Sequence, residues 1–247
     1  MSHLGEGGYA GVALGAEFCA RRLPPAPQVR EAARRCREEG LVFSLVTPVV
    51  REGAWEDVIR WLSELAPAVE GGEWAANDWG LLQWARGAGL PLRPVAGRLL
   101  GRQRRDPRVL ELLRVFSPED AAGLRGSAWD DPGAAALLAE FGVRRVELDL
   151  LLQGVRIPAL SPHIRVSLCG PWIPVTVAPS CPWTRDPLSC PRACRTHPAA
   201  QQQCGEEPHP LFSRGNALFV RIDEIPPGRA LAAAGADRLV WSPELPG

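Results

Sequence analysis

The chain contains no lysine, one methionine and one tyrosine among its 247 residues. All 28 basic residues are therefore arginines, and 28 acidic residues balance them to a formal net charge of zero. This balance excludes a surface that is basic throughout, as a general nucleic-acid-binding protein would have. With 46% hydrophobic and 23% charged residues, the composition is that of a globular protein with a sizeable core.

Long apolar runs are also missing. No stretch of eighteen apolar residues occurs, so we expect no transmembrane helix and no membrane partner. The N-terminal residues lack the basic start and apolar run of a signal peptide, which predicts a cytoplasmic protein. Disulfides are rare in that compartment, so the seven cysteines are expected to be metal ligands, core residues or reactive thiols.

Short strands and helices are predicted to alternate along the chain. Strands are expected at residues 9–14, 41–47, 73–77, 90–97, 144–151, 216–223 and 237–242. Helices are expected at residues 27–40, 54–66, 79–89, 107–116, 132–142 and 228–236. Strands separated by helices of about ten residues predict an α/β fold with a parallel sheet, either closed into a barrel or open.

Polar residues follow several of the predicted strands. In a barrel such positions converge on the carboxyl face, where active sites form. On this basis the candidate catalytic residues are Asn77, Asp78, Arg98 and Glu147. The alternative is that polar residues simply belong at strand ends.

Residues 152–215 break the alternation. The segment is rich in proline and holds five of the seven cysteines and three of the four histidines. Irregular segments of this length are usually functional or disordered, although residues 163–177 could form two short strands.

Three cysteines in this segment, Cys181, Cys190 and Cys194, lie within fourteen residues of one another. Thiolates at such spacing can converge on one metal or cluster. Zinc would also accept His197 or His209, whereas an iron–sulfur cluster prefers a fourth thiolate. Cys36 and Cys169 are expected to be core residues, and Cys204 is either a spare thiol or a ligand.

Several segments, taken in order, carry a resemblance to a known family. They are "ALGAEFCARR" with the following helix and "LVFSLVT", "EWAANDWGLLQWARGAGLPLRPVAGRLLGRQRRDPR", "RRVELDLLLQG", "LFSRGNALFVRID" and "GADRLVWSPE". The chain resembles the collagenase-like peptidase family of unassigned mechanism (peptidase U32), and most of all its UbiV-type iron–sulfur proteins of ubiquinone biosynthesis. The resemblance spans nearly the whole chain.

The resemblance implies a parallel TIM-like α/β barrel formed by one domain, residues 1–247, with residues 152–215 as a cluster-binding insertion. It implies a [4Fe–4S] cluster held by Cys19, Cys181, Cys190 and Cys194, with zinc as the alternative metal. Either Cys169 or Cys204 could replace Cys19 in this set. The family's opening strand and helix and its final helix are missing from the sequence, so we expect a barrel that is incomplete at both ends.

The same resemblance implies a role in oxygen-independent hydroxylation, as catalyst or as partner subunit. One alternative is RNA modification, for which Arg98, Arg102, Arg104, Arg105 and Arg108 would supply phosphate contacts, although RNA is not the favoured partner. A second is a U32-type peptidase, although neither Gly-x-Ser-x-Gly nor His-Glu-x-x-His occurs. The third is a non-catalytic interaction protein with a structural cluster, which would pair with a related barrel protein.

Overall fold

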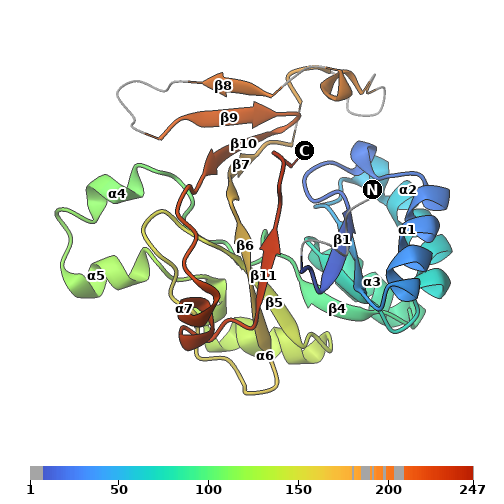
Figure 1. Cartoon of the computed structure of the whole chain (residues 1–247), viewed down its shortest axis with the longest axis horizontal. Coiled ribbons are helices and arrows are strands. Elements are labelled where there is room, and N and C mark those ends of the chain that lie inside the picture. Colours follow the sequence, from blue (N-terminus) through green and yellow to red (C-terminus); the bar gives the residue numbers. More distant parts are fainter. Residues whose placement is uncertain are drawn as a thin grey trace. The chain divides into compact units, whose positions relative to one another are not determined.

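The protein is described by a computed structural model that covers residues 8–179, 181–184, 190, 192–196, 199–202 and 209–246. The chain divides into two compact units, Met1–Val95 and Ala96–Gly247 (Figure 1). The single domain expected from the sequence stays a prediction.

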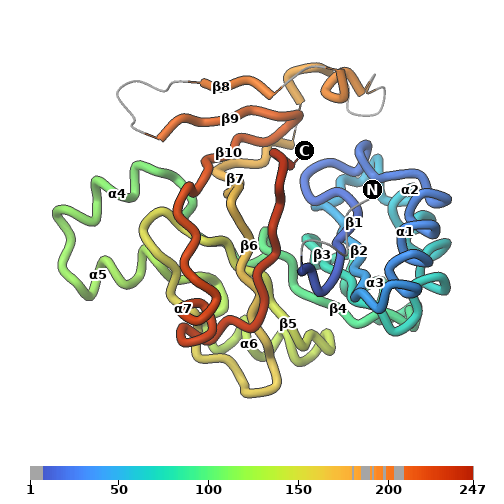
Figure 2. Tube along the Cα trace, viewed as in Figure 1, coloured from blue at the N-terminus to red at the C-terminus, as the bar shows by residue number. Residues whose placement is uncertain are grey.

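Unit 1 is built from parallel strands and helices in alternation. Its strands lie in the order β1-β2-β3-β4, and β1 pairs with β2 from Gly11↔Val42 to Gly15↔Val46. The elements are β1 (Gly11–Gly15), α1 (Ala26–Glu38), β2 (Val42–Thr47), α2 (Trp55–Leu65), β3 (Glu73–Ala76), α3 (Trp79–Ala88) and β4 (Arg93–Ala96). Figure 2 shows α1, α2 and α3 together on one flank of these strands.

The helices of unit 1 form where the apolar period is helical. In α1 the buried side chains include Val29, Ala33 and Cys36, which lie on one face. The exposed face of α1 carries ion pairs such as Arg34 with Glu31 and Glu38. The apolar face therefore packs onto the strands and the charged face meets solvent.

Unit 2 contains a second group of parallel strands, in the order β5-β6-β11. The elements of this group are α4 (Val109–Leu112), α5 (Pro118–Gly123), α6 (Pro132–Glu140), β5 (Arg145–Asp149), β6 (Arg165–Gly170), α7 (Gly228–Ala233) and β11 (Arg238–Trp241). All five residues of β5 are buried. Polar residues alternate with Val146 and Leu148 along this strand, so one of its two faces is apolar and the other is polar.

Unit 2 also contains an antiparallel sheet in the order β7-β10-β9-β8 (Figure 1). Its strands are β7 (Trp172–Val177), β8 (Ala200–Gln202), β9 (Leu211–Arg214) and β10 (Ala217–Arg221). A two-residue turn, Gly215–Asn216, joins β9 to β10, and Gly215 has a φ of 61°, which glycine adopts without strain.

The structure confirms the predicted mixed α/β character and the parallel pairing of β2 with β3 and of β5 with β6. The two short strands expected within residues 163–177 are β6 and β7. Closure into a barrel stays a prediction.

Three expectations about the elements were wrong. Strand β10, within the predicted strand 216–223, pairs antiparallel with β7 and β9 instead of joining the parallel sheet. The helix expected at 107–116 is only the short α4, because the chain turns after Leu112 and its apolar residues Val115 and Phe116 are exposed. The segment 152–215 was expected to be irregular apart from residues 163–177, but it also contains β8 and β9.

Within the described part of the chain, no helix combines the length and the apolar character needed to cross a membrane.

Candidate metal centre and buried ion-pair network

The cysteine-rich segment begins at the turn that joins β9 to β10. The backbone N–H of Ala178 donates to the carbonyl oxygen of Asn216 at 2.8 Å. In return, the side-chain Nδ2 of Asn216 donates to the carbonyl oxygen of Ala178 at 2.9 Å. This reciprocal pair fixes the chain three residues before Cys181.

The far end of the same segment returns to the same turn. Cys194 is buried within the short 3₁₀ helix η6 (Ala193–Arg195). A Cβ atom added to Gly215 would lie 3.9 Å from the Cβ of Cys194, so the cysteine packs against the turn. The turn at Gly215–Asn216 thus holds the start of the segment and its third cysteine.

The sulfur of Cys190 accepts a hydrogen bond from the backbone N–H of Arg192, with an N···S distance of 3.4 Å. Arg192 has φ 55° and ψ 30°, a left-handed conformation that is unfavourable for any residue with a side chain. Left-handed residues next to right-handed ones turn successive N–H groups toward one concave side, and such nests bind anions, iron–sulfur clusters among them. The backbone around Cys190 therefore suits a negatively charged sulfur.

A buried donor lies beside this turn as well. Arg214 precedes Gly215, and its Nη1 donates to the carbonyl oxygen of Leu245 at 2.5 Å. Its Nε is buried and has no hydrogen-bond partner among the described residues. A buried donor without a partner costs free energy, which an anionic ligand at the turn would relieve.

The structure places the predicted metal ligands as follows. Cys181 and Cys190 are partly exposed and belong to unit 2 with Cys194, whereas Cys19 lies at the start of the 3₁₀ helix Ala20–Arg22 in unit 1. Among the residues that the structure describes, no three His, Cys, Asp or Glu side chains are gathered closely enough to hold a metal ion. Convergence of the four thiols stays a prediction.

The cysteines and histidines outside the proposed ligand set differ in their surroundings. Cys36 and Cys169 are buried, as predicted, in α1 and β6. Burial raises the pKa of the Cys36 thiol, with a smaller contribution from the charge of Glu39, so this thiol keeps its proton and is a poor metal ligand. His197 and Cys204 lie outside the described residues, and His209 is partly exposed.

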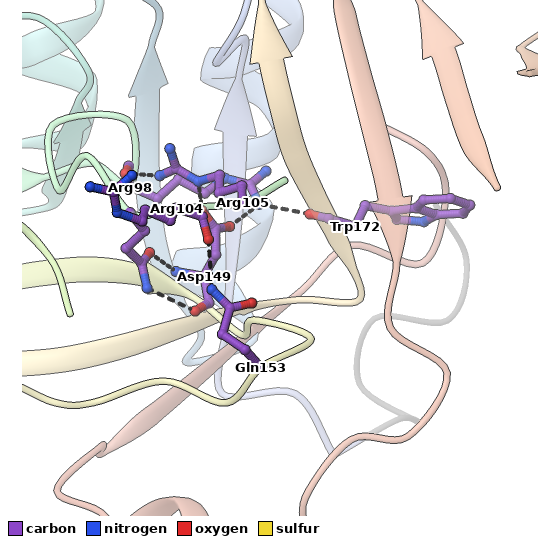
Figure 3. A network of polar contacts seen from close by, with 7 residues as sticks. Arg98, Arg104, Arg105, Asp149, Gln153 and Trp172 are labelled. Atoms are coloured by element: carbon purple, nitrogen blue, oxygen red, sulfur yellow. Dashed lines mark hydrogen bonds and ion pairs between the residues drawn. The ribbon is translucent and has the colours of Figure 1, made fainter. Parts of the chain in front are cut away.

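A second feature of unit 2 is a buried ion-pair network centred on Asp149, the last residue of β5 (Figure 3). One carboxylate oxygen of Asp149 accepts from Nη1 of Arg98 at 2.9 Å, and the other accepts from Nε of Arg105 at 2.5 Å. The side chains of Asp149 and Arg98 are 0% and 2% exposed. Charges at this depth are stable only when they are paired and hydrogen-bonded.

Main-chain groups also take part in this network. Arg98 also donates to the carbonyl oxygen of Trp172 at 2.9 Å, and Arg105 donates to that of Arg98 at 2.5 Å. The side-chain amide of Gln103 bonds both the N–H and the carbonyl oxygen of Asp149, at 2.6 and 3.2 Å. The network therefore ties the loop after β4 to the ends of β5 and β6, where β7 begins.

Arg98 and Glu147 were both predicted as polar residues that follow predicted strands. Glu147 is buried two residues before Asp149 and pairs in register with Ser167 of β6. Asp149 was not among the candidate catalytic residues, and Arg105 was selected only as a candidate phosphate contact. The signal was present in "RRVELDLL", where a charged residue occupies every second position of a strand whose other positions are apolar.

The same polar face continues toward the start of β5. Arg145 donates to the hydroxyl of Ser167 at 3.0 Å and to both carboxylate oxygens of Asp237. Burial alone would raise the pKa of Asp237, but the hydrogen bond from Arg145 and the charges of Arg145, Arg165 and Arg238 lower it below its ordinary value.

The other two candidates, Asn77 and Asp78, have structural partners in unit 1. Nδ2 of the buried Asn77 donates to the carbonyl oxygen of Thr47 at 3.0 Å and joins the ends of β2 and β3. Asp78 is the N-cap of α3. Its two oxygens accept from the N–H groups of Leu81 at 3.1 Å and Val50 at 3.0 Å. These contacts account for both polar residues, and a catalytic role for them stays a prediction.

No protein-family model matches the chain, and no curated protein is significantly similar to it. Among solved structures, the chain is similar to the U32 peptidase Mk0906, with 12% sequence identity and a TM-score of 0.47. The similarity covers 96% of this chain and 86% of that one. Similarity at this level does not establish a shared activity.

Proposed function

We propose that this protein binds a [4Fe–4S] cluster through Cys181, Cys190 and Cys194, with Cys19 as the fourth ligand, and acts in oxygen-independent hydroxylation as catalyst or partner subunit. The observation that carries the metal-binding part is the turn at Gly215–Asn216, which holds both the start of the cysteine segment and Cys194. When bound, such a cluster supplies electron transfer or Lewis-acid chemistry.

The residues of this segment fit the cluster in three ways. The N–H of Arg192 already donates to the sulfur of Cys190, which is the bond that a cluster thiolate requires. Buried Nε of Arg214 offers a further donor at the turn. Thiolate ligation would also supply the segment with stabilisation that its sequence, poor in apolar residues, does not provide.

Ligation would require the thiols to approach one another more closely than the described residues do. Metal binding and the approach of the three thiols are therefore expected to be coupled, as they are in small metal-binding domains. Resistance of this segment to proteolysis should rise when the metal is bound.

The test is anaerobic purification followed by iron, sulfide and zinc analysis and by electron paramagnetic resonance. We expect about four irons per chain. Cys190→Ala and Cys194→Ala should lower the iron content or make the cluster oxygen-labile, whereas Cys36→Ala, the matched control, should keep it. Stoichiometric zinc without iron would show that the site binds zinc and not an iron–sulfur cluster. Unchanged iron in Cys190→Ala and Cys194→Ala would exclude the segment, and unchanged iron in Cys19→Ala would exclude the fourth ligand.

A further inference from the structure

The loop between β4 and α4 exposes two arginines between fixed neighbours. Gln103 is buried and Arg105 is nearly so, and both bind Asp149. Arg102 precedes Gln103, and Arg104 lies between Gln103 and Arg105. Both Arg102 and Arg104 are exposed. The buried residues anchor the loop, and the exposed ones are presented to solvent from a fixed backbone.

Gln153 joins this loop to a third exposed arginine. Its buried side-chain amide donates to the carbonyl oxygens of Arg104 at 2.7 Å and Leu124 at 3.0 Å (Figure 3). Its own carbonyl oxygen accepts from Nε of Arg125 at 2.8 Å. Gln153 thus contacts the backbone of Arg104 through its side chain and the guanidinium group of Arg125 through its main chain.

The backbone at Arg102 is held in an unfavourable conformation. Its φ is 46°, and only one other described residue besides glycine, Arg192, has a positive φ. Strain of this kind persists where the surroundings impose it, and it concentrates at binding sites. The strained conformation of Arg102 therefore favours a role in binding for its exposed side chain.

The charges in this region do not balance. Arg98 and Arg105 share Asp149, Arg108 pairs with Asp106, and Arg156 pairs with Asp130. In the described portion of the chain, none of Arg102, Arg104 and Arg125 has a carboxylate within 4.0 Å. Among the described residues, three exposed arginines of this region thus have no carboxylate partner, on a protein whose formal net charge is zero.

We propose that Arg102, Arg104 and Arg125 form a binding site for phosphoryl groups on unit 2. Guanidinium forks match phosphate oxygens in geometry and charge, and Nε of Arg125 is already oriented by Gln153, which leaves its two terminal amino groups for a ligand. The proposed site recognises only phosphate oxygens. Both a small phosphorylated compound and the backbone of a single-stranded RNA would offer such oxygens.

The experiment measures binding of inorganic pyrophosphate by calorimetry and of a labelled twelve-nucleotide single-stranded RNA by fluorescence anisotropy, with the full-length protein at low salt. Arg104→Gln/Arg125→Gln should weaken binding at least about ten-fold. Arg108→Gln/Arg156→Gln removes the same charge from two arginines that have carboxylate partners, and should change binding less than about two-fold.

A second variant, Arg102→Gln/Arg104→Gln, removes no side-chain hydrogen bond among the described residues and guards against loss of folding in the first. Binding of pyrophosphate alone would identify a small phosphorylated ligand. Binding of both, in competition, would identify a nucleic-acid backbone, and the salt slope should then fall in magnitude by about 0.7 for each arginine removed. Absence of binding to either probe, or equal losses in the control pair, would overturn the proposal.

Discussion

Replacing Asp149 with asparagine removes the carboxylate at the centre of the buried network and leaves the shape of the side chain almost unchanged. The main-chain bonds between residue 149 and Gln103 would remain, because they do not involve the carboxylate. The bonds from Arg98 and Arg105 would be lost or weakened, and the new amide would direct a donor toward a guanidinium group. Two arginines that are 2% and 10% exposed would then lose the counter-charge that Asp149 supplies.

The expected loss follows from these contacts. A hydrogen bond to a charged group contributes roughly 1.5–3 kcal/mol, and two of them are affected. Breaking a buried ion pair by removing one partner costs about 3–5 kcal/mol. We therefore expect Asp149→Asn to lower the free energy of unfolding by about 4 kcal/mol, which corresponds to a fall in Tm of roughly 8–16 °C for a protein of this size.

The assay is thermal and urea denaturation followed by circular dichroism, with Asp106→Asn as the matched control. Asp106 has the same side chain and also pairs with an arginine, but Arg108 is 77% exposed and the pair is open to solvent. The control should lose less than about 1 kcal/mol. If Asp149→Asn also lowers the free energy of unfolding by less than about 1 kcal/mol, the reasoning is refuted, because the buried network would then stabilise the protein no more than a surface ion pair does.

Three further predictions concern single residues. Asp78→Ala should lower stability by about 1–2 kcal/mol through loss of the α3 N-cap, and Asp78→Asn should restore most of it because one cap acceptor remains; equal losses in urea denaturation would contradict the cap role. Asp237 has a lowered pKa, so the stability it contributes is present above about pH 4 and is lost as the pH falls through its folded-state pKa. The difference between wild type and Asp237→Asn in acid denaturation should therefore shrink below about pH 4, and a difference that grows there would contradict this sign. Arg102→Gly should raise Tm by about 1–3 °C, since a left-handed residue costs about 1–2 kcal/mol and glycine's extra entropy when unfolded offsets part of that gain; a lower Tm would show that the Arg102 side chain itself stabilises the loop.

Local sequence signals predicted the strands and helices of unit 1 well. In α1 the helical spacing of Val29, Ala33 and Cys36 is visible in the sequence because local packing decides it. Strand β10 was found but placed in the wrong sheet. Its partner β7 lies about forty residues earlier, and no local pattern indicates an antiparallel partner at that distance. Its other partner, β9, lies just across the Gly215–Asn216 turn, a local hairpin signal that the sequence prediction did not use.

The candidate sites divide in the same way. Arg98 could be selected because it follows a strand, but its partner Asp149 is 51 residues away, and only the folded chain shows that the two share one ion pair. Asp78 carried the same sequence signal and is a helix cap, because a polar residue after a strand is also the residue that begins the next helix. Position after a strand therefore selects candidates without separating function from capping.

The two features of unit 2 are joined through β7. Arg98 holds the carbonyl oxygen of Trp172 at the start of this strand, and Asn216 holds Ala178 just beyond its end, next to the cysteine segment. A loss of metal in Asp149→Asn would therefore not identify Asp149 as a ligand, because release of Arg98 would also free one end of β7. Cys190→Ala and Cys194→Ala leave both ends of β7 held, so a loss of metal in these variants would come from the missing thiol. The assignment of ligands consequently rests on the cysteine variants, and the network variants report on how the segment is positioned.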